Sequence, residues 1–532
     1  MIHDRRDATC VNEAKMDSRS RRFRRALSIH SRMFAAACSA ATMSALAFVL
    51  TSGCASSPDP LPATVVPPLN TPATRLLAAW VAAYNSGSVD TLSAFAAGAF
   101  TAAALARTPA AQRAASDAWV FLNVGPIEIV EVDSVSGDTA ASAIVRQSRL
   151  GAWGRARARV TADSAHPLLS AGLYAYLEDA PLRFREKYGP MDDAARIHAV
   201  VTALETLAAA DAFSGVVLIA RGDSVLLHRA YGFADREQRV RNHADTRFEL
   251  ASVGKMFTGV GIARLVELGK LAFDDTLATL LPDYPNSEAA RRITVHHLLT
   301  HSSGVLDYLE QDRYQEAKRA GRIRGLADIW PFFASDTLRF SPGTRVEYSN
   351  SNFALLGAVI ERISGLSFSE FVRKHVFDPA GMRETWVTDS STGWRALGYT
   401  RFDGHGPDLT SWHAVPPAGA AGGPAGGGIA SAGDLLRFAR ALLAHKLLSP
   451  AMTSAILVGR MSSGAGERVG YGFDETTRRG VRYVGHNGGY MGTYNEVDIY
   501  PELGYTTVVL SNYDTMGPRA AAEAVRRALA RR

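Results

Sequence analysis

FELASVGK, residues 248–255, stands where a strand-like segment gives way to a helical pattern that continues through Met256, Val260 and Leu265. Ser252 and Lys255 are three residues apart, a step that puts two side chains on one face of a helix. Free backbone N–H groups at a helix N-terminus favour developing negative charge. A desolvated lysine can lose its proton, which an arginine effectively cannot. We therefore predict that Ser252 is a nucleophile and that Lys255 belongs to its base.

Two further polar segments lie downstream of this pair. Tyr348-Ser349-Asn350 comes directly before an apolar helical pattern, and His486-Asn487-Gly488-Gly489 ends a strand-like segment. Glycines at such a strand end let the backbone pass close to a ligand. We expect the backbone N–H of Gly489, together with that of Ser252, to bind an oxyanion.

The strand patterns around these segments predict the architecture. They occur early, at residues 215–220 and 224–228, and again late, at 482–486, 496–500 and 505–510. A helical pattern at 520–530 follows the last of them. We expect one antiparallel sheet that joins the first and last strands, with the terminal helices on one face and a helical insertion between, which is an αβα sandwich of the α+β class.

Five segments together resemble a known family. FELASVGK, LLTHSSG, SPGTRVEYSNSNFALLG, GGGIASAGD and GHNGGYMG occur in the order and approximate spacing of the class C β-lactamase and penicillin-binding-protein type of serine hydrolase. The resemblance covers residues 194–532 and implies the β-lactamase/transpeptidase-like fold.

The same resemblance implies roles for individual residues. Ser252 would attack a carbonyl and form an acyl-enzyme that water hydrolyses, with Lys255 and Tyr348 sharing the proton transfer. This chemistry implies no cofactor and no metal. The implied substrate-binding residues are Asn350, His486, Gly488 and Gly489.

One position departs from the β-lactamase pattern, because His486 stands where those enzymes have a lysine. Histidine is only partly charged near neutrality, so we rank an esterase, D-amino-acid peptidase or DD-carboxypeptidase above a true β-lactamase. A true β-lactamase, or a catalytically idle protein that binds penicillin or peptidoglycan, remains the alternative. The expected partner is a small-molecule or peptide substrate.

The N-terminal half predicts three further segments. Residues 1–54 contain an arginine-rich stretch, the apolar run 33–50 and then Cys54, which is typical of an export signal of the lipoprotein type. A plain cleaved signal or an uncleaved anchor is the alternative, since the run could just span a bilayer. Residues 55–72, with six prolines, predict a stiff linker. Residues 73–182 resemble the small cone-shaped α+β domains of the nuclear-transport-factor-2-like (NTF2-like) group, and we assign them no activity.

The leader fixes the expected location. The body would lie outside the cytoplasm, in the periplasm or cell envelope, and would meet the membrane only through a lipid on Cys54 or through the signal segment itself. Because the stretch before the apolar run is long, Met16 is a candidate start.

Composition excludes several functions. Residues 1–54 hold nine Lys/Arg and four Asp/Glu, which leaves +1 of the net +6 for the rest of the chain, so we expect no nucleic-acid partner. All three cysteines lie at or before Cys54, and no zinc or nucleotide-binding motif is present. We expect His301 to be structural and the glycine-rich run 419–428 to be a flexible surface loop.

Overall fold

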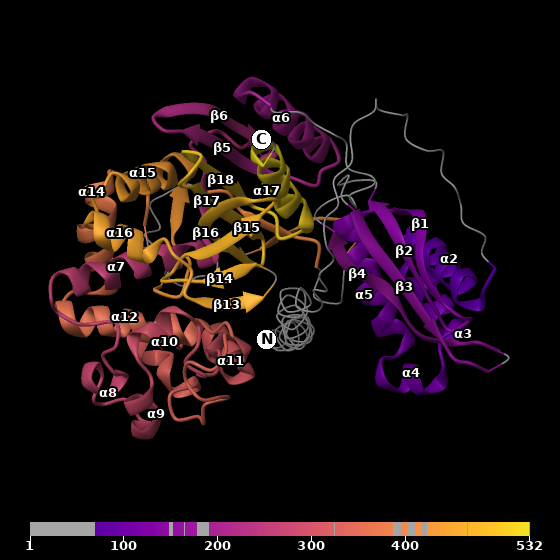
Figure 1. The fold of residues 1–532 in the computed structure, drawn as a ribbon, viewed down its shortest axis with the longest axis horizontal. Helices are drawn as coiled ribbons and strands as arrows, with labels where there is room; N and C mark the ends of the chain where they lie inside the picture. The colour runs from indigo at the N-terminus through magenta and orange to yellow at the C-terminus, as the bar shows by residue number, and fades with distance from the viewer. Residues whose placement is uncertain are drawn as a thin grey trace, which may run out of the picture. The chain divides into compact units, whose positions relative to one another are not determined.

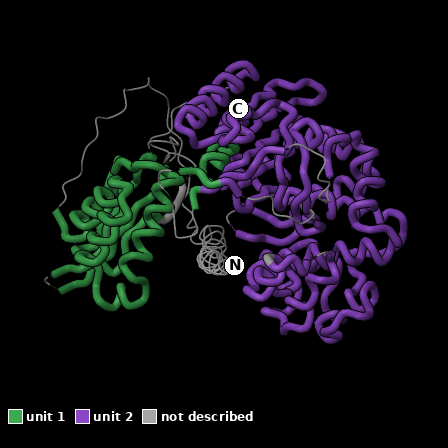
Figure 2. Tube along the Cα trace, turned by 180° about the vertical axis from the view of Figure 1, so that it is seen from behind, with its two compact units in different colours: residues 1–190, 401–413, 515–523 green, residues 191–400, 414–514, 524–532 purple. Residues whose placement is uncertain are grey.

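The structure is a computed structural model that describes residues 70–147, 153–163, 165–177, 191–323, 325–386, 395–402, 408, 411–415, 423–464 and 466–530. These residues divide into two compact units, which Figure 2 shows in different colours. Unit 1 consists mainly of residues before 191, and unit 2 mainly of residues from 191 onward. The export signal, Cys54 and the linker up to residue 69 lie outside the described residues.

Unit 1 places helices before strands, as the sequence predicted. Its helices are α2 (Pro72–Asn85), α3 (Val89–Ala99), α4 (Ala102–Arg107) and α5 (Ala110–Val124), and its strands are β1 (Ile127–Ser136), β2 (Ala140–Gln147), β3 (Trp153–Val160) and β4 (Leu168–Leu177). The strands form an antiparallel sheet in the order β1-β2-β3-β4. Trp80 and Tyr84 of α2 are buried in its core. The NTF2-like assignment and the bounds 73–182 stay predictions.

Unit 2 is built around an eight-stranded sheet in the order β13-β14-β15-β16-β17-β18-β5-β6. The first strand of the unit, β5, pairs antiparallel with its last strand, β18, so that Val216 lies opposite Leu510. The predicted union of early and late strands in one sheet is therefore confirmed. The strands are β5 (Gly215–Arg221), β6 (Ser224–Tyr231), β13 (Met461–Gly464), β14 (Glu467–Val469), β15 (Asp474–Arg478), β16 (Val481–Tyr490), β17 (Thr493–Tyr500) and β18 (Tyr505–Ser511).

Helices cover both faces of this sheet (Figure 1). The helices α6 (Asp193–Ala209) and α17 (Met516–Leu529) lie on one face: Arg196 donates to the hydroxyl of Tyr505, and Arg526 pairs with Asp498. Alternate residues of the same strands, such as Val497 and Leu510, point into the main core on the other face. The predicted αβα layering is thus present.

The helical layer between β6 and β13 forms that main core. Phe257 of α7 (Lys255–Glu267) contacts Phe438 of α15 (Ala432–Leu443) edge to face, with 5.1 Å between ring centroids. The remaining helices of the layer are α8 (Leu277–Leu280), α9 (Ser287–Arg292), α10 (Val295–Leu299), α11 (Asp312–Arg319), α12 (Asn350–Ser364), α13 (Phe368–Val372), α14 (Asp378–Ala380) and α16 (Pro450–Ile456).

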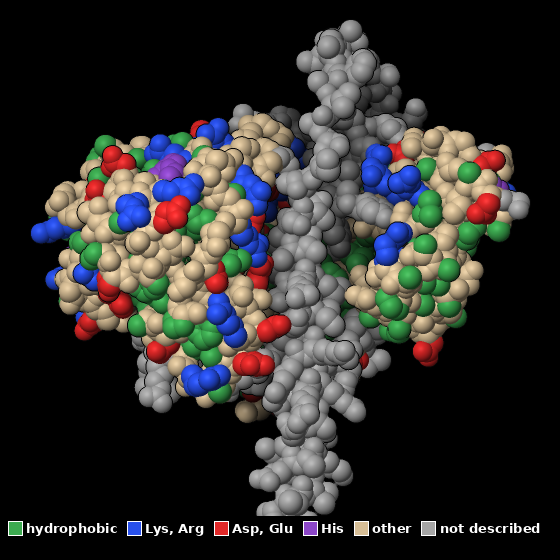
Figure 3. All heavy atoms as spheres, turned by 90° about the horizontal axis from the view of Figure 1, so that it is seen from below, with side chains coloured by type: hydrophobic (Ala, Val, Ile, Leu, Met, Phe, Trp, Pro, Cys, Tyr) green, Lys and Arg blue, Asp and Glu red, His purple; other side chains and the backbone are tan. Residues whose placement is uncertain are grey.

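Short elements complete unit 2. They are the strands β7 (Phe233–Asp235), β8 (Val240–Arg241), β9 (Arg247–Glu249), β10 (Gly398–Thr400), β11 (His413–Val415) and β12 (Ile429–Ser431), and the helical turns η2 (Ala251–Gly254), η3 (Tyr308–Glu310), η4 (Leu326–Asp328), η5 (Trp330–Phe332) and η6 (Arg373–Phe377). On the face shown in Figure 3, acidic and basic side chains are interspersed over unit 2. Within the described ranges, no helix is both long enough and apolar enough to span a bilayer.

Candidate active site

The turn that carries Ser252 is held between two strands. Strand β9 pairs with β12, which brings the glycine-rich segment 423–428 against the turn. Leu250 N–H donates to Gly428 O at 2.9 Å, and Gly427 N–H donates to Ala251 O at 2.7 Å. Ala251 has a φ of 47°, a left-handed conformation that is costly for alanine and typical of strained functional turns. Ser252 therefore lies in the 3-10 turn η2 that leads into α7.

Strand β16 passes directly beside this turn. A Cβ on Gly488 would lie 2.3 Å from the carbonyl oxygen of Leu250 and 2.8 Å from the nitrogen of Ser252. Only glycine fits at this approach, because real Cβ contacts are never that short. The predicted glycine at the end of the third motif thus brings β16 within reach of the Ser252 backbone.

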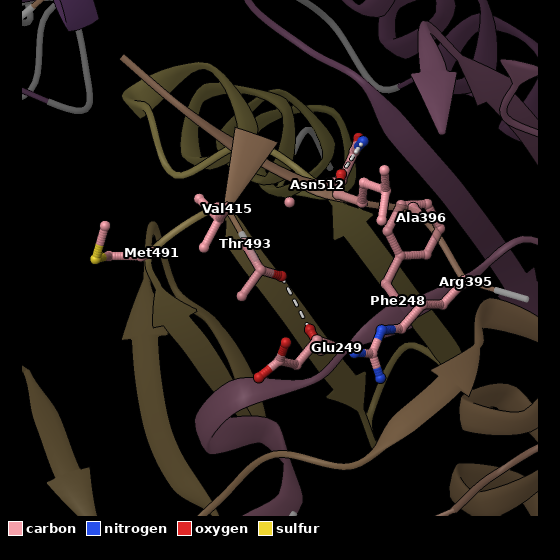
Figure 4. A pocket seen from close by; sticks show the side chains of 11 residues that line it. Phe248, Glu249, Arg395, Ala396, Val415, Met491, Thr493 and Asn512 are labelled. Atoms are coloured by element: carbon pink, nitrogen blue, oxygen red, sulfur yellow. Dashed lines mark hydrogen bonds between the residues drawn. The ribbon is translucent and has the colours of Figure 1, made fainter. Parts of the chain in front are cut away.

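Strand β17 anchors the residue just before the turn. Thr493 and Asn495 donate to the carbonyl oxygen of Glu249 at 2.9 and 2.7 Å, and Figure 4 shows the first of these hydrogen bonds. A small pocket opens beside Glu249 and Thr493, lined also by Phe248, Met491 and Asn512. Neither Ser252 nor its predicted partners line it, so this pocket is separate from the predicted chemistry.

Three of the predicted side chains meet at one hydroxyl. Ser252 Oγ lies 3.1 Å from Lys255 Nζ and 2.7 Å from the Tyr348 hydroxyl. Lys255 is fully buried, whereas Ser252 is partly exposed and Tyr348 is 45% exposed. The predicted nucleophile is therefore accessible to solvent, whereas the neighbouring amine is not. The spacing predicted from the sequence places Ser252 and Lys255 together, and the fold adds Tyr348.

Lys255 is enclosed by carbonyl oxygens and by aromatic rings. Its Nζ donates to Asn350 Oδ1 at 2.8 Å and to Ala425 O, and it lies 4.8 Å from the centre of the Tyr348 ring. Burial lowers the pKa of Lys255 from 10.5 to about 7, against the opposing effect of the Asp307 and Asp474 carboxylates. About half of the amines are then neutral at neutral pH, the state that a general base requires.

Tyr348 is held by a histidine. The His301 ring packs against the Tyr348 ring with 4.3 Å between centroids, and its Nδ1 accepts from Ser349 N–H at 3.2 Å and faces Asn352. Burial holds the pKa of His301 well below its usual value, so the ring is neutral. Through these contacts His301 packs against Tyr348 and accepts from the backbone of Ser349. They are consistent with the structural role that we expected for His301.

Asn350 begins α12 and is buried, with both ends of its amide engaged. Its Oδ1 faces Lys255, and its Nδ2 donates to Asp307 Oδ2 at 2.8 Å. An amide nitrogen carries two hydrogens, so one remains for a substrate. The predicted role of Asn350 in orienting the substrate stays a prediction.

His486 is buried, with 7% of its surface exposed. Desolvation lowers its pKa to about 4, assisted by the charge of Lys255. The imidazole is therefore neutral near pH 7, and any contact it makes with a substrate is polar rather than ionic. The strand pairing of β15 with β16 ends at Gly485, and among the described residues no strand pairs on that side with the segment from His486 to Gly489. The oxyanion role of Gly489 stays a prediction.

The sequence analysis missed two carboxylates and misjudged one loop. Asp307 and Asp474 were not singled out, although Asp307 is a lone acid inside the apolar run VLDYL, a detectable signal. The expectation of a flexible surface loop is wrong for residues 423–428, where Pro424 and Ala425 are buried. Thr258 Oγ1 donates to Pro424 O at 2.7 Å, and Ala425 O accepts from Lys255. This segment therefore packs directly against the buried amine. Among the described residues, no group of three or more His, Cys, Asp or Glu side chains is placed to hold a metal ion.

Comparisons with known proteins identify the family of this chain. The model of the family described as Beta-lactamase matches residues 200–532. Penicillin-binding protein 4* of Bacillus subtilis (strain 168) is 32% identical over 333 residues, which cover 58% of this chain and 70% of that protein. The crystal structure of a penicillin binding protein from Bacillus halodurans superposes with a TM-score of 0.56 and 32% identity, over 61% of this chain and 98% of that one.

A more distant structure shares the fold. The D-amino acid amidase from Ochrobactrum anthropi SV3 superposes with a TM-score of 0.54 at 22% identity, over 63% of this chain and 98% of that chain. The predicted β-lactamase/transpeptidase-like fold of unit 2 is therefore confirmed.

Proposed function

The chain belongs to the beta-lactamase family, and from this we propose that it is a serine hydrolase that cleaves an ester or an amide through an acyl-enzyme. The observation that carries the proposal is the position of Ser252 Oγ, within hydrogen-bonding distance of both the Lys255 amine and the Tyr348 hydroxyl. A hydroxyl becomes a strong nucleophile when an adjacent base removes its proton.

In the proposed acylation, the proton of Ser252 Oγ moves to the neutral Lys255 amine while Oγ bonds to the substrate carbonyl carbon. The carbonyl oxygen becomes an oxyanion that accepts hydrogen bonds from the N–H groups of Ser252 and Gly489. When this intermediate collapses, the bond to the alcohol or amine breaks, and the leaving group receives a proton through Tyr348. Water then attacks the acyl-enzyme and releases the acid and free Ser252.

The charge of the site bears on the choice of substrate. His486 is buried and, with a pKa lowered to about 4 by desolvation, brings no positive charge to the site at neutral pH. Carboxylate recognition requires a positive charge or several donors. We therefore rank esters and D-amino-acid amides or peptides without a free carboxylate beside the scissile bond above β-lactams. True β-lactamase activity and idle penicillin binding are outcomes of the test.

The test is one purified sample of the full chain, assayed with p-nitrophenyl esters, D-alanyl amides, nitrocefin and a fluorophosphonate probe. We expect ester or amide hydrolysis and covalent labelling, both lost in Ser252→Ala. Labelling and hydrolysis that persist in Ser252→Ala would refute the assignment. Labelling by penicillin without turnover of any substrate would favour the binding protein, and rapid nitrocefin hydrolysis the β-lactamase.

We also propose that the protein is exported and carries a lipid on Cys54, on the strength of the leader sequence alone. Radiolabelled palmitate should be incorporated by the wild type and not by Cys54→Ala. Incorporation that continues in the variant would remove the lipid anchor from the proposal.

A further inference from the structure

The direction of the Lys255 lone pair depends on two carbonyl oxygens. Nζ contacts Asn350 Oδ1, Ala425 O and Ser252 Oγ. A neutral amine has two hydrogens and one lone pair. Carbonyl oxygens only accept hydrogen bonds, so both hydrogens are bound to Asn350 and Ala425. The lone pair is then left for the third direction, toward the hydroxyl of Ser252.

This arrangement holds only while Asn350 presents its oxygen to Lys255. A carboxamide can turn over and present its NH₂ group in the same place. Turned over, Asn350 would donate to the amine and occupy the lone pair that Ser252 needs. The backbone carbonyl of Ala425 cannot turn in this way, so Asn350 is the variable partner.

Asp307 removes that freedom. Asn350 Nδ2 donates to Asp307 Oδ2 at 2.8 Å, and Leu309 N–H donates to Asp307 Oδ1 at 2.9 Å. An ionised carboxylate only accepts, so it demands the NH₂ end of Asn350 and directs the oxygen end toward Lys255. Asp307 and Asn350 are each 8% exposed and Lys255 is fully buried, so water does not readily substitute for any of the three.

We propose that Asp307 is a positioning residue for the hydrolytic reaction, whose carboxylate fixes the Asn350 amide so that the lone pair of Lys255 faces Ser252. The inference rests on the proposed function. It extends the Ser252–Lys255 pair to a series of four groups, of which Lys255, Asn350 and Asp307 are buried. In this series Asn350 orients the base, and Asp307 orients Asn350.

The proton balance of acylation agrees with this series. When Ser252 Oγ gives up its proton, Lys255 becomes an ammonium whose three N–H groups point to Asn350 Oδ1, Ala425 O and Ser252 Oγ. The negative charge of Asp307 stabilises that ammonium across Asn350. No proton needs to reach Asp307, since its partners in the site are donors.

Other groups also bear on the charge of Lys255. Asp474 of β15 opposes the effect of burial, and His301 and His486 are held neutral nearby, while the Tyr348 ring covers the amine. Burial raises the pKa of Asp307, assisted by the carboxylate of Glu310, and the hydrogen bonds from Leu309 and Asn350 oppose that rise by favouring the carboxylate. A test must therefore change Asp307 without touching these groups.

The experiment compares Asp307→Asn with the exchange variant Asp307→Asn/Asn350→Asp. In the single variant, the amide introduced at position 307 can donate as well as accept, so Asn350 is no longer fixed. We expect kcat for a p-nitrophenyl ester to fall by about a hundredfold with little change in KM, the scale of a misaligned general base. Because the Asp307 charge raises the pKa of Lys255, the acidic limb of the kcat/KM profile should also move to lower pH.

The exchange variant restores an acceptor toward Lys255. The amide at position 307 donates to the carboxylate introduced at position 350, whose other oxygen faces the amine directly. We expect the acidic limb to lie at higher pH than in the wild type, because the anion is now closer to the amine. The recovery of kcat should be partial, because the carboxylate at position 350 has no N–H for the substrate. This variant has the same atoms in exchanged places, so it separates polarity from packing.

Asp434→Asn is the matched control. Asp434 is fully buried and accepts from Glu384 N–H and the Thr385 hydroxyl, both at 2.8 Å, as Asp307 accepts from its neighbours. This variant should lose thermal stability and keep the wild-type pH profile. A wild-type kcat and acidic limb in Asp307→Asn, or an exchange variant whose acidic limb does not lie at higher pH than in the single variant, would overturn the role of Asp307. Wild-type protein that neither turns over esters or amides nor labels at Ser252 would instead overturn the proposed function.

Discussion

The pH dependence of hydrolysis follows from the burial of Lys255. Desolvation lowers its pKa from 10.5 to about 7. The shift means that the site disfavours the ammonium form relative to the neutral amine by about 5 kcal/mol more than water does. At pH 7 about half of the amines are neutral, compared with about 3 in 10,000 for an ordinary lysine. We expect kcat/KM for a neutral ester to rise about tenfold per pH unit below about pH 7 and to level off above it.

Asp474 is a second group whose titration could produce the same acidic limb, and its substitution is therefore the control. Burial raises the pKa of Asp474 to about 7 as well, against the effect of the Lys255 charge. If Lys255 produces the limb, Asp474→Asn should keep it and move it to lower pH, since the anion raises the pKa of the amine. If Asp474 produces the limb, the variant should lose it.

Lys255→Arg completes the test. A guanidinium stays charged throughout the accessible range, so kcat should fall between about a hundredfold and ten thousandfold. The assay is steady-state hydrolysis of a p-nitrophenyl ester between about pH 5 and pH 9, with circular dichroism to confirm the fold. A flat profile across that range, or an arginine variant with near wild-type turnover, would refute the assignment of Lys255 as the base.

Three further variants test other contacts. Tyr348→Phe removes one hydrogen-bond partner of Ser252 but keeps the ring, so we expect a loss of about a hundredfold in kcat with an unchanged melting temperature, and wild-type turnover would contradict the proton-transfer role. Gly488→Ala forces a Cβ to 2.3 Å from a backbone oxygen; unfolding in denaturant should show a loss of about 1–3 kcal/mol, absent from Gly98→Ala, where nothing lies within 4 Å. Arg526→Met removes the ion pairs of two buried carboxylates, Glu496 and Asp498, and should cost about 3–5 kcal/mol of unfolding free energy; a change below about 1 kcal/mol would show that these ion pairs are not coupled to folding.

The sequence predicts a contact within the site most directly where the two residues are close together in the chain. Ser252 and Lys255 meet because residues three apart in a helix lie on the same face. This relation depends on no other part of the fold. Tyr348 lies 96 positions from Ser252. Only its place in a series of motifs linked it to the serine.

The missed parts have no local pattern that specifies their partners. Asp307 acts on Asn350 across 43 positions, and a single acid in an apolar run does not specify its partner. The Ala425 carbonyl that accepts from Lys255 is a backbone atom, which leaves no signature in residue identity. Glycines in the run 419–428 suggested flexibility, yet a Cβ on Gly426 would lie 2.8 Å from Ala251 O. There the missing side chain permits close packing, and composition alone does not distinguish that from a mobile loop.

The fold was predicted further than the site, because strand alternation and helical periodicity repeat over many residues. The union of early and late strands and the helices on both faces followed from the order of these patterns. The bounds of the short strands β9 and β12, which bring the glycine segment to Ser252, did not. Three-residue strands carry too little alternation to be read from sequence.

The pairing of β5 with β18 determines when the proposed active site can be completed. Val216 and Leu510 are 294 positions apart in the chain, and contacts of such separation close late, since the loop entropy must be lost first. Until then the β5–β6 hairpin has an open edge that can recruit another chain. The helical layer that carries Lys255 can form from nearer contacts, but β16 reaches its place beside Ser252 only as part of the completed sheet. The need for a chaperone should therefore last until the final strand has been made, and turnover should begin only after it.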